Sequence, residues 1–177
     1  MNPQPEQVAG AEATRLEALF EAQHSRLYRL ARRLAGEADE ARDLTQETFL
    51  RAARHAAALP VTDEAAGAWL VRVLVNLCRD RARRRRTQER LTPRPAAVSS
   101  SPGPEGIGLL RHQVRTALAA LPPRRRAVAV LHYYEDRDVA EIAALLGLTR
   151  VTVRWHLAAA RRDLARDLGP SRGADHE

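Results

Sequence analysis

The residues best suited to contacting another molecule lie near the C-terminus, in the segment Asp138–Arg154. Its apolar positions recur at helical spacing, Gly147 permits a tight turn, and Thr149 can cap a second helix. This is the pattern of a helix-turn-helix, whose second helix can enter the major groove of DNA. The alternatives are an ordinary helical hairpin with solvated arginines and, for the tryptophan, a packing role. The residues that we expect to contact DNA are Thr149, Arg150, Val151, Thr152, Arg154 and Trp155.

A second candidate site is a stripe of polar side chains along a predicted helix that starts near Trp69. Its members are three or four residues apart, so they share one helix face. Arginines on such a face suit backbone phosphates, and an amide can read an exposed base edge. The arginine-rich run from Arg79 to Arg86 favours a polyanionic partner, because close like charges repel unless they are neutralised. The tryptophan could lie beside unstacked bases or belong to the core. The candidate residues are Trp69, Arg72, Asn76, Arg79 and Arg83.

The predicted helix before this one, which starts near Ala38, is acidic instead. Carboxylates in its first turn are explained by the helix dipole. Asp43 and Glu47 lie too far along the helix for that, and they are one turn apart with Gln46 beside them. This polar face would bind a basic or amide-rich protein surface better than DNA. Spacing alone explains it equally well as a solvated surface.

Small helical bundles must position these three faces, because apolar residues recur at three- and four-residue spacing on both sides of a breaker-rich segment. The predicted fold class is all-α, with two small helical domains joined by a flexible linker and a helix-turn-helix in the C-terminal one. The predicted bounds are 14–90 for the first domain, 91–108 for the linker and 109–168 for the second, with disordered tails at 1–13 and 169–177.

Three helices are expected in the first domain and four short helices in the second. In the first domain, a connecting segment is predicted from Arg54 to Gly67. The positions assigned to the inward-facing stripes there are Leu16, Leu19, Phe20, Leu27, Leu30, Ala31, Leu34, Leu44, Thr48, Phe49, Ala52, Trp69, Leu70, Val73, Leu74, Leu77 and Cys78. Those of the second domain are Val114, Leu118, Leu121, Val128, Leu131, Val139, Ile142, Ala143, Leu146, Leu148, Val153, Leu157 and Leu164.

The composition argues for a nucleic-acid partner and against an enzyme. The net charge is +7 and every basic side chain is an arginine, so lysine-dependent phosphate loops and Schiff bases are excluded. The single Cys78 and the scattered histidines offer no disulfide and no metal-ligand spacing, and we expect no metal or cofactor. The N-terminus has no signal pattern and no apolar run is long enough to span a bilayer, so we expect a soluble, cytoplasmic protein.

Taken together, these segments resemble the extracytoplasmic-function (ECF) sigma factors, the smallest group of the sigma-70 family, over most of residues 16 to 168. The stretch from Asp39 resembles the family's polymerase-clamp-binding segment, and the stretch from Ala68 resembles its helix for opening and reading the −10 element. Residues from Ala119 and the helix-turn-helix are similar to the domain that reads the −35 element. The resemblance implies core RNA polymerase and promoter DNA as partners, and by analogy an anti-sigma protein.

The resemblance also implies residue roles. Asp43, Gln46 and Glu47 would grip the polymerase clamp, whereas Asn76, Arg79 and Arg83 would lie near the melted strand. The sequence departs from the family in two places: the segment His55–Gly67 lacks the expected aromatic residues, and Trp155-His156 stands where small or basic residues are usual. Base contacts of that segment and the −35 preference are therefore left unassigned. The competing interpretation is a stand-alone helix-turn-helix regulator with an N-terminal sensing or dimerisation domain.

Overall fold

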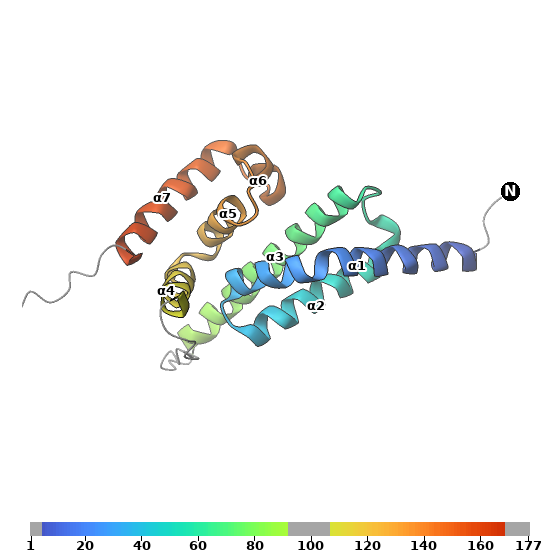
Figure 1. Ribbon diagram of the computed structural model, residues 1–177, viewed down its shortest axis with the longest axis horizontal. Coiled ribbons are helices and arrows are strands. Elements are labelled where there is room, and N and C mark those ends of the chain that lie inside the picture. The colour runs from blue at the N-terminus through green and yellow to red at the C-terminus, as the bar shows by residue number, and fades with distance from the viewer. Residues whose placement is uncertain (1–4, 92–106, 169–177) are drawn as a thin grey trace, which may run out of the picture. The chain divides into compact units, whose positions relative to one another are not determined.

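The computed structural model describes residues 5–91 and 107–168, which form seven α-helices and one short 3-10 helix (Figure 1). The all-α prediction is confirmed. The chain divides into two compact units, and the division falls between Cys78 and Arg79, within α3. The elements are α1 (Pro5–Ala35), α2 (Ala38–Arg54), η1 (Ala56–Ala58), α3 (Asp63–Leu91), α4 (Ile107–Ala120), α5 (Pro123–Tyr133), α6 (Val139–Leu146) and α7 (Arg150–Leu168).

The core of the first unit is built from leucine, valine and alanine at helical spacing. α1 and α2 pack against each other, and Gly36 allows the sharp reversal between them with a φ of +94°. Buried residues of α3 complete this core. The largest fully buried side chains of this unit are Leu27, Leu30, Leu70, Val71, Leu74 and Val75.

The first helix starts earlier than the sequence analysis predicted. α1 begins at Pro5, so the prediction of a disordered tail over residues 1–13 is wrong for residues 5–13. Proline suits the first position of a helix, because its fixed φ is helical and its missing N–H would lack a partner there anyway. The alanine- and glutamate-rich residues that follow have high helix propensity. Residues 1–4 lie outside the described part of the chain.

The third helix also starts earlier than predicted. α3 begins at Asp63, so residues 63–67 of the predicted connecting segment are helical and Trp69 lies inside the helix. The Thr62 hydroxyl accepts a hydrogen bond from the backbone N–H of Ala65 at 3.3 Å, and Asp63 and Glu64 favour the helix dipole. The connection from α2 is therefore residues 55–62, and it contains η1.

Some inward-facing predictions for the first unit are wrong. Phe20 is 44 % exposed, although its ring contacts those of His24 and Phe49 at centroid distances of 4.7 Å each. On α3, Val73 and Cys78 are only half-buried, whereas Val71 and Val75 are buried. A 3.6-residue period allows neighbours on either side of a stripe to face inward, and tertiary packing decides between them.

In the second unit, α7 packs against α4, α5 and α6. The four predicted helices are present, although α7 is longer than expected at 19 residues. Leu146 was expected to be buried but is half-buried, and Leu145 is buried instead. Both positions are one turn from the fully buried Ile142, so the periodicity could not separate them. The largest fully buried side chains are Leu121, Leu131, Ile142, Val128, Val130 and Val153.

The described helices reach slightly into the predicted linker, because α3 ends at Leu91 and α4 begins at Ile107. The rest of that linker, residues 92–106, and the predicted C-terminal tail, residues 169–177, lie outside the described residues. Within the described ranges, no helix combines the length and the apolar character needed to cross a bilayer.

Candidate nucleic-acid interface

The first helix of the predicted helix-turn-helix, α6, has a capping box at its N-terminus. The Asp138 carboxylate accepts a hydrogen bond from the Glu141 backbone N–H at 2.7 Å, and the Glu141 carboxylate accepts one from the Asp138 backbone N–H at 2.8 Å. The backbone hydrogen bond, followed by the hydrogen bond from Arg137, lowers the pKa of Glu141. These contacts fix where α6 begins.

The turn between α6 and α7 has the geometry that its sequence predicts. Gly147 adopts a φ of +63°, which a side chain would strain. The Thr149 hydroxyl then accepts a hydrogen bond from the Thr152 backbone N–H at 3.1 Å, so the predicted cap of α7 is confirmed. A second contact of 2.8 Å joins the hydroxyls of Thr149 and Thr152. The two threonines thus define the start of α7.

One face of α7 is exposed to solvent and carries the side chains proposed to contact DNA. Arg150 and Arg154 are exposed, and so are Val151 (73 %) and Trp155 (57 %). Val153, in contrast, is fully buried, because α7 presents its opposite face to the other helices of the unit. The face is therefore mixed: two guanidinium groups lie beside an aliphatic and an aromatic side chain.

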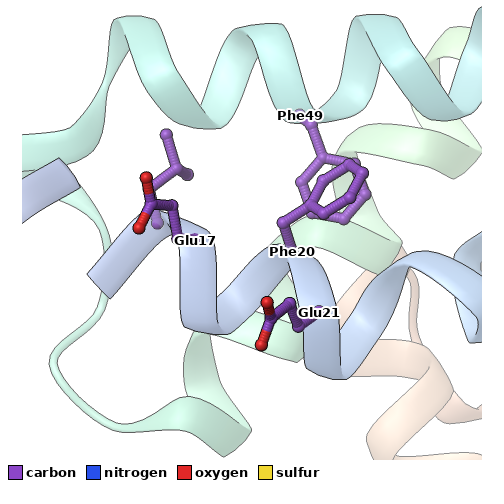
Figure 2. Close-up of a pocket in the computed structure, with 5 residues that line it drawn as sticks. Glu17, Phe20, Glu21 and Phe49 are labelled. Atoms are coloured by element: carbon purple, nitrogen blue, oxygen red, sulfur yellow. The ribbon is translucent and has the colours of Figure 1, made fainter. Parts of the chain in front are cut away.

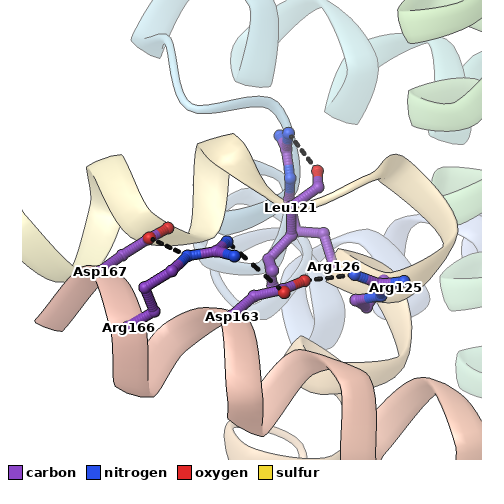
Figure 3. Close-up of polar contacts among 6 residues, drawn as sticks. All are labelled: Leu121, Arg125, Arg126, Asp163, Arg166 and Asp167. Atoms are coloured by element: carbon purple, nitrogen blue, oxygen red, sulfur yellow. Dashed lines mark hydrogen bonds and ion pairs between the residues drawn. The ribbon is translucent and has the colours of Figure 1, made fainter. Parts of the chain in front are cut away.

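A half-buried ion pair flanks the tryptophan at the edge of this face. Arg125 of α5 pairs with Asp163 of α7, and both side chains are about one-fifth exposed, at 19 % and 21 %. The guanidinium carbon of Arg125 also lies 5.6 Å from the centroid of the Trp155 ring. Asp163 lies between Arg125 and Arg166, whose nearest nitrogen is 3.6 Å from its carboxylate (Figure 3). Sequence reasoning missed this cluster.

His156, next to the tryptophan, is half-buried. Its Nδ1 is buried and has no hydrogen-bond partner among the described residues, and its ring meets the Trp155 ring edge-on at 4.9 Å. Burial lowers the pKa of His156, and the positive charges of Arg124 and Arg125 lower it further. The imidazole is therefore partly packed within the second unit, in contrast to the exposed Trp155 ring.

The polar stripe on α3 is continuous, because α3 extends to Leu91 without a break. Arg72, Asn76 and Arg83 are exposed, whereas Arg79 and Trp69 are half-buried. The Arg83 guanidinium also lies 3.4 Å from the Asp80 carboxylate, so part of its charge is balanced locally. The stripe presents three solvent-facing polar side chains and a partly covered tryptophan.

On α2, the three residues predicted to bind the polymerase differ in solvent exposure and in ion pairing. Asp43 and Gln46 are exposed, but Glu47 is half-buried and its carboxylate lies 3.0 Å from Arg51 and 3.9 Å from Arg54. Leu50, one turn after Gln46, is 51 % exposed. Sequence reasoning missed this residue, although its position in register with the polar side chains was a usable signal. The face of α2 therefore combines acid and amide groups with one apolar side chain.

An open groove of about 310 Å³ lies between α1 and α2 on the first unit. Phe20 of α1 and Phe49 of α2 line it, and their rings lie against one another (Figure 2). Leu16 adds to its apolar lining, and Glu17 and Glu21 supply carboxylates from α1. The groove was not expected, because Phe20 was assigned to the core.

Two family models match the chain, and each falls on one part of it. Sigma-70 region 2 matches residues 19–88, and Sigma-70 region 4 matches residues 111–164. The chain is also 36 % identical over 163 residues to the ECF RNA polymerase sigma factor SigL of Mycobacterium tuberculosis, covering 88 % of this chain and 90 % of the relative.

The chain belongs to the ECF subfamily of sigma-70 factors. A second relative, the ECF RNA polymerase sigma factor SigM of M. tuberculosis, is 34 % identical, with 85 % of this chain and 76 % of the relative covered. Two solved structures support the sigma-factor fold. RpoE, in a complex with the anti-sigma factor NepR from Bartonella quintana, has a TM-score of 0.72 at 22 % identity over 88 % of this chain and 98 % of that one. CnrH, in a complex with the cytosolic domain of CnrY, has a TM-score of 0.66 at 24 % identity over 94 % and 95 %.

Family membership settles the main functional prediction. The protein is an RNA polymerase sigma factor that directs promoter recognition, and as such it is a specificity subunit without catalytic activity. The alternative of a stand-alone regulator does not hold, because region 2 occupies the part of the chain where a sensing domain would lie.

Proposed function

We propose that this sigma factor uses three separate faces: one on α2 for the core polymerase, one on α3 for the opened −10 element, and one on α7 for the −35 element. The observation that carries the proposal is the difference in chemistry between the proposed face of α2 and those of α3 and α7. The proposed face of α2 exposes the carboxylate of Asp43 and the amide of Gln46, whereas the proposed faces of α3 and α7 expose guanidinium groups. A protein surface and a polyanion require this separation of charge, because the same face cannot attract both.

The polymerase face consists of Asp43, Gln46 and Glu47. Asp43 and Gln46 are exposed, and Leu50 adds an apolar contact one turn further along. Interfaces combine such apolar centres with polar rims, and carboxylates set their preference for a basic partner. The expected partner surface is therefore a basic element of the polymerase clamp with an apolar position facing Leu50.

The −10 face consists of Trp69, Arg72, Asn76, Arg79 and Arg83. Exposed arginines at helical spacing can follow the phosphates of one strand, and the amide of Asn76 can bond to the edge of an unpaired base. Trp69 is half-buried, so only part of its ring is available for stacking on a base. We assign the arginines to affinity and Asn76 to base reading.

The −35 face consists of the cap Thr149 and the residues that follow it on α7. Arg150 and Arg154 lie one turn apart on the exposed face, which suits paired contacts to base edges or phosphates in a major groove. Thr152 is half-buried and bonded to Thr149, so its role is to order the start of the helix. Val151 and Trp155 supply the apolar contacts.

We further propose that an anti-sigma protein restrains this factor. The two fold neighbours named above were both solved in complexes: RpoE with the anti-sigma factor NepR, and CnrH with the cytosolic domain of CnrY. Competition for the polymerase-binding face of α2 is the simplest way for such a partner to act. We place the factor in the cytoplasm, where it would meet polymerase and promoter DNA.

The proposal is tested by reconstituting transcription from the full chain, core polymerase and a promoter library, with run-off transcripts as the readout. Reversing both charges, with Asp43→Arg and Glu47→Arg, should abolish holoenzyme formation without unfolding the chain. Glu17→Arg with Glu21→Arg changes the charge equally on α1 and serves as the control. Arg150→Ala with Arg154→Ala should leave core binding intact and reduce promoter selection. Normal holoenzyme formation by the α2 variant would overturn the α2 assignment.

A further inference from the structure

Trp155 is an unusual surface residue. It is the largest side chain on the exposed face of α7, and 57 % of it is accessible to solvent. Its neighbours on that face include Arg150 and Arg154, whose charges favour a polyanionic partner. An exposed aromatic ring among cations, on a helix proposed to enter a major groove, is well placed to touch the bases themselves.

One side of the Trp155 ring is in contact with the rest of the second unit. The Arg125 guanidinium, which comes from α5, lies 5.6 Å from the centroid of the Trp155 ring, within the range of a cation–π contact. Arg125 is itself held by its ion pair with Asp163, and both partners are mostly buried. Asp163 lies about two turns after Trp155 on α7, so one helix supplies both the tryptophan and the anchor of the arginine.

We propose that Trp155 is a specificity-determining residue that contacts the 5-methyl group of a thymine in the −35 element, and that Arg125 is a positioning residue that holds the Trp155 ring for this contact. The inference rests on the proposed −35 function of α7. Thymine is the base selected because its methyl group is the apolar feature that the major groove offers. An indole ring restrained by Arg125 offers hydrocarbon surface and little rotational freedom to lose on binding.

The decisive experiment changes the DNA and leaves the protein intact. A −35 element is first selected from a randomised library by the wild-type holoenzyme, and each thymine in it is then replaced by deoxyuridine, which lacks only the 5-methyl group. At one thymine, the replacement should weaken holoenzyme binding about fourfold, the change expected for losing one buried methyl contact. If no thymine is selected, or if no replacement weakens binding, the proposal is overturned.

Variants then assign the methyl contact to Trp155. In Trp155→Ala, the ratio of affinities for thymine and deoxyuridine at that position should fall to about one, and Trp155→Phe should retain part of it. If Trp155→Ala weakens binding to both DNAs equally, the tryptophan contacts the backbone or the polymerase, and the methyl assignment is wrong. Unchanged promoter selection by Arg150→Ala with Arg154→Ala would instead overturn the proposed −35 function of α7, so the two failures are distinguishable.

The role of Arg125 is tested separately. Arg125→Met should reduce the thymine-to-deoxyuridine ratio and, in a Trp69→Phe background, lower the fluorescence anisotropy of Trp155 in the free protein, because the ring would rotate more freely. Arg125→Lys keeps the charge beside Asp163 but loses the planar guanidinium, and it should give an intermediate result. The exposed Arg124 provides the matched control, since Arg124→Met removes the same charge at the adjacent residue. An unchanged ratio and unchanged anisotropy in Arg125→Met would overturn the positioning role.

Discussion

The carboxylate of Glu47 lies 3.0 Å from the Nε of Arg51, one turn later on α2, and 3.9 Å from Arg54. This ion pair neutralises part of the charge that Glu47 would present to the polymerase. Asp43, on the same face, is exposed. The two carboxylates are therefore not equivalent, although their spacing in the sequence makes them look so.

We expect Asp43→Ala to weaken binding to core polymerase more than Glu47→Ala does. The difference should be about 1 kcal/mol or less if both carboxylates lie at the solvent-exposed rim of the interface. A third variant, Arg51→Ala, removes the ion-pair partner of Glu47. It should therefore strengthen the binding of the sigma factor to core polymerase. Competition with a labelled wild-type chain for core polymerase measures all three. A greater loss for Glu47→Ala would show that the pair with Arg51 opens in the complex.

A second prediction concerns the arginines at the start of α7. Arg150→Ala and Arg154→Ala should each reduce holoenzyme affinity for the preferred −35 element by about 1 to 3 kcal/mol if the side chain bonds to a base edge. The exposed Arg162, which lies about two turns after Arg154 on α7, serves as the control, and Arg162→Ala should have a smaller effect. Binding is measured against the preferred element and a scrambled one. Equal losses on both DNAs would assign the arginine to a phosphate.

The parts of the fold that were predicted correctly depend on local chemistry. The turn at Gly147 and the cap at Thr149 need only residues within a few positions of one another. The start of α3 was also locally encoded, in Thr62 and Asp63, but the prediction gave weight to the apolar period that begins at Trp69 and missed the cap.

The parts that were missed depend on contacts between distant residues. Arg125 and Asp163 are 38 positions apart, on α5 and α7, and no periodicity pairs them before the helices are packed. The solvent exposure of Phe20 likewise depends on how α2 packs against α1 around this side chain. Helical spacing assigns a residue to a stripe, but the packing of other helices decides which edge of the stripe is buried.

A third prediction tests the capping box of α6. Asp138→Ala removes the side-chain acceptor for the Glu141 backbone N–H and should lower the free energy of unfolding of the second unit by about 1 kcal/mol. Asp138→Asn keeps an acceptor at the same place and should recover most of the loss. Urea unfolding, followed by far-UV circular dichroism, gives both values. If the asparagine variant is as unstable as the alanine variant, the charge of Asp138 matters more than its hydrogen bond.

A fourth prediction compares two apolar residues of α1. Leu30→Ala should lower the free energy of unfolding by about 2 to 5 kcal/mol, because Leu30 is 1 % exposed and its removal leaves a cavity. Phe20→Ala should cost less, despite the larger side chain, because Phe20 is 44 % exposed and borders an open groove. Denaturant unfolding of the full chain measures both. An equal or greater cost for Phe20→Ala would mean that the groove is closed in solution.

The last prediction concerns the pH dependence of the second unit. Burial, with Arg124 and Arg125 nearby, lowers the pKa of His156 below its ordinary value of 6.5. Below pH 6.5 the unfolded chain therefore binds a proton at this position that the folded chain resists, so stability falls as the pH falls toward the lowered pKa. Above pH 6.5 the imidazole is neutral in both states and contributes no slope.

His156→Gln should make the unfolding free energy less dependent on pH below 6.5, as measured by denaturant unfolding monitored through Trp155 fluorescence in a Trp69→Phe background. The same slope in the His156→Gln variant would assign the pH dependence to other groups. Arg125→Met should also reduce the slope, because it removes one of the positive charges that disfavour protonation of His156.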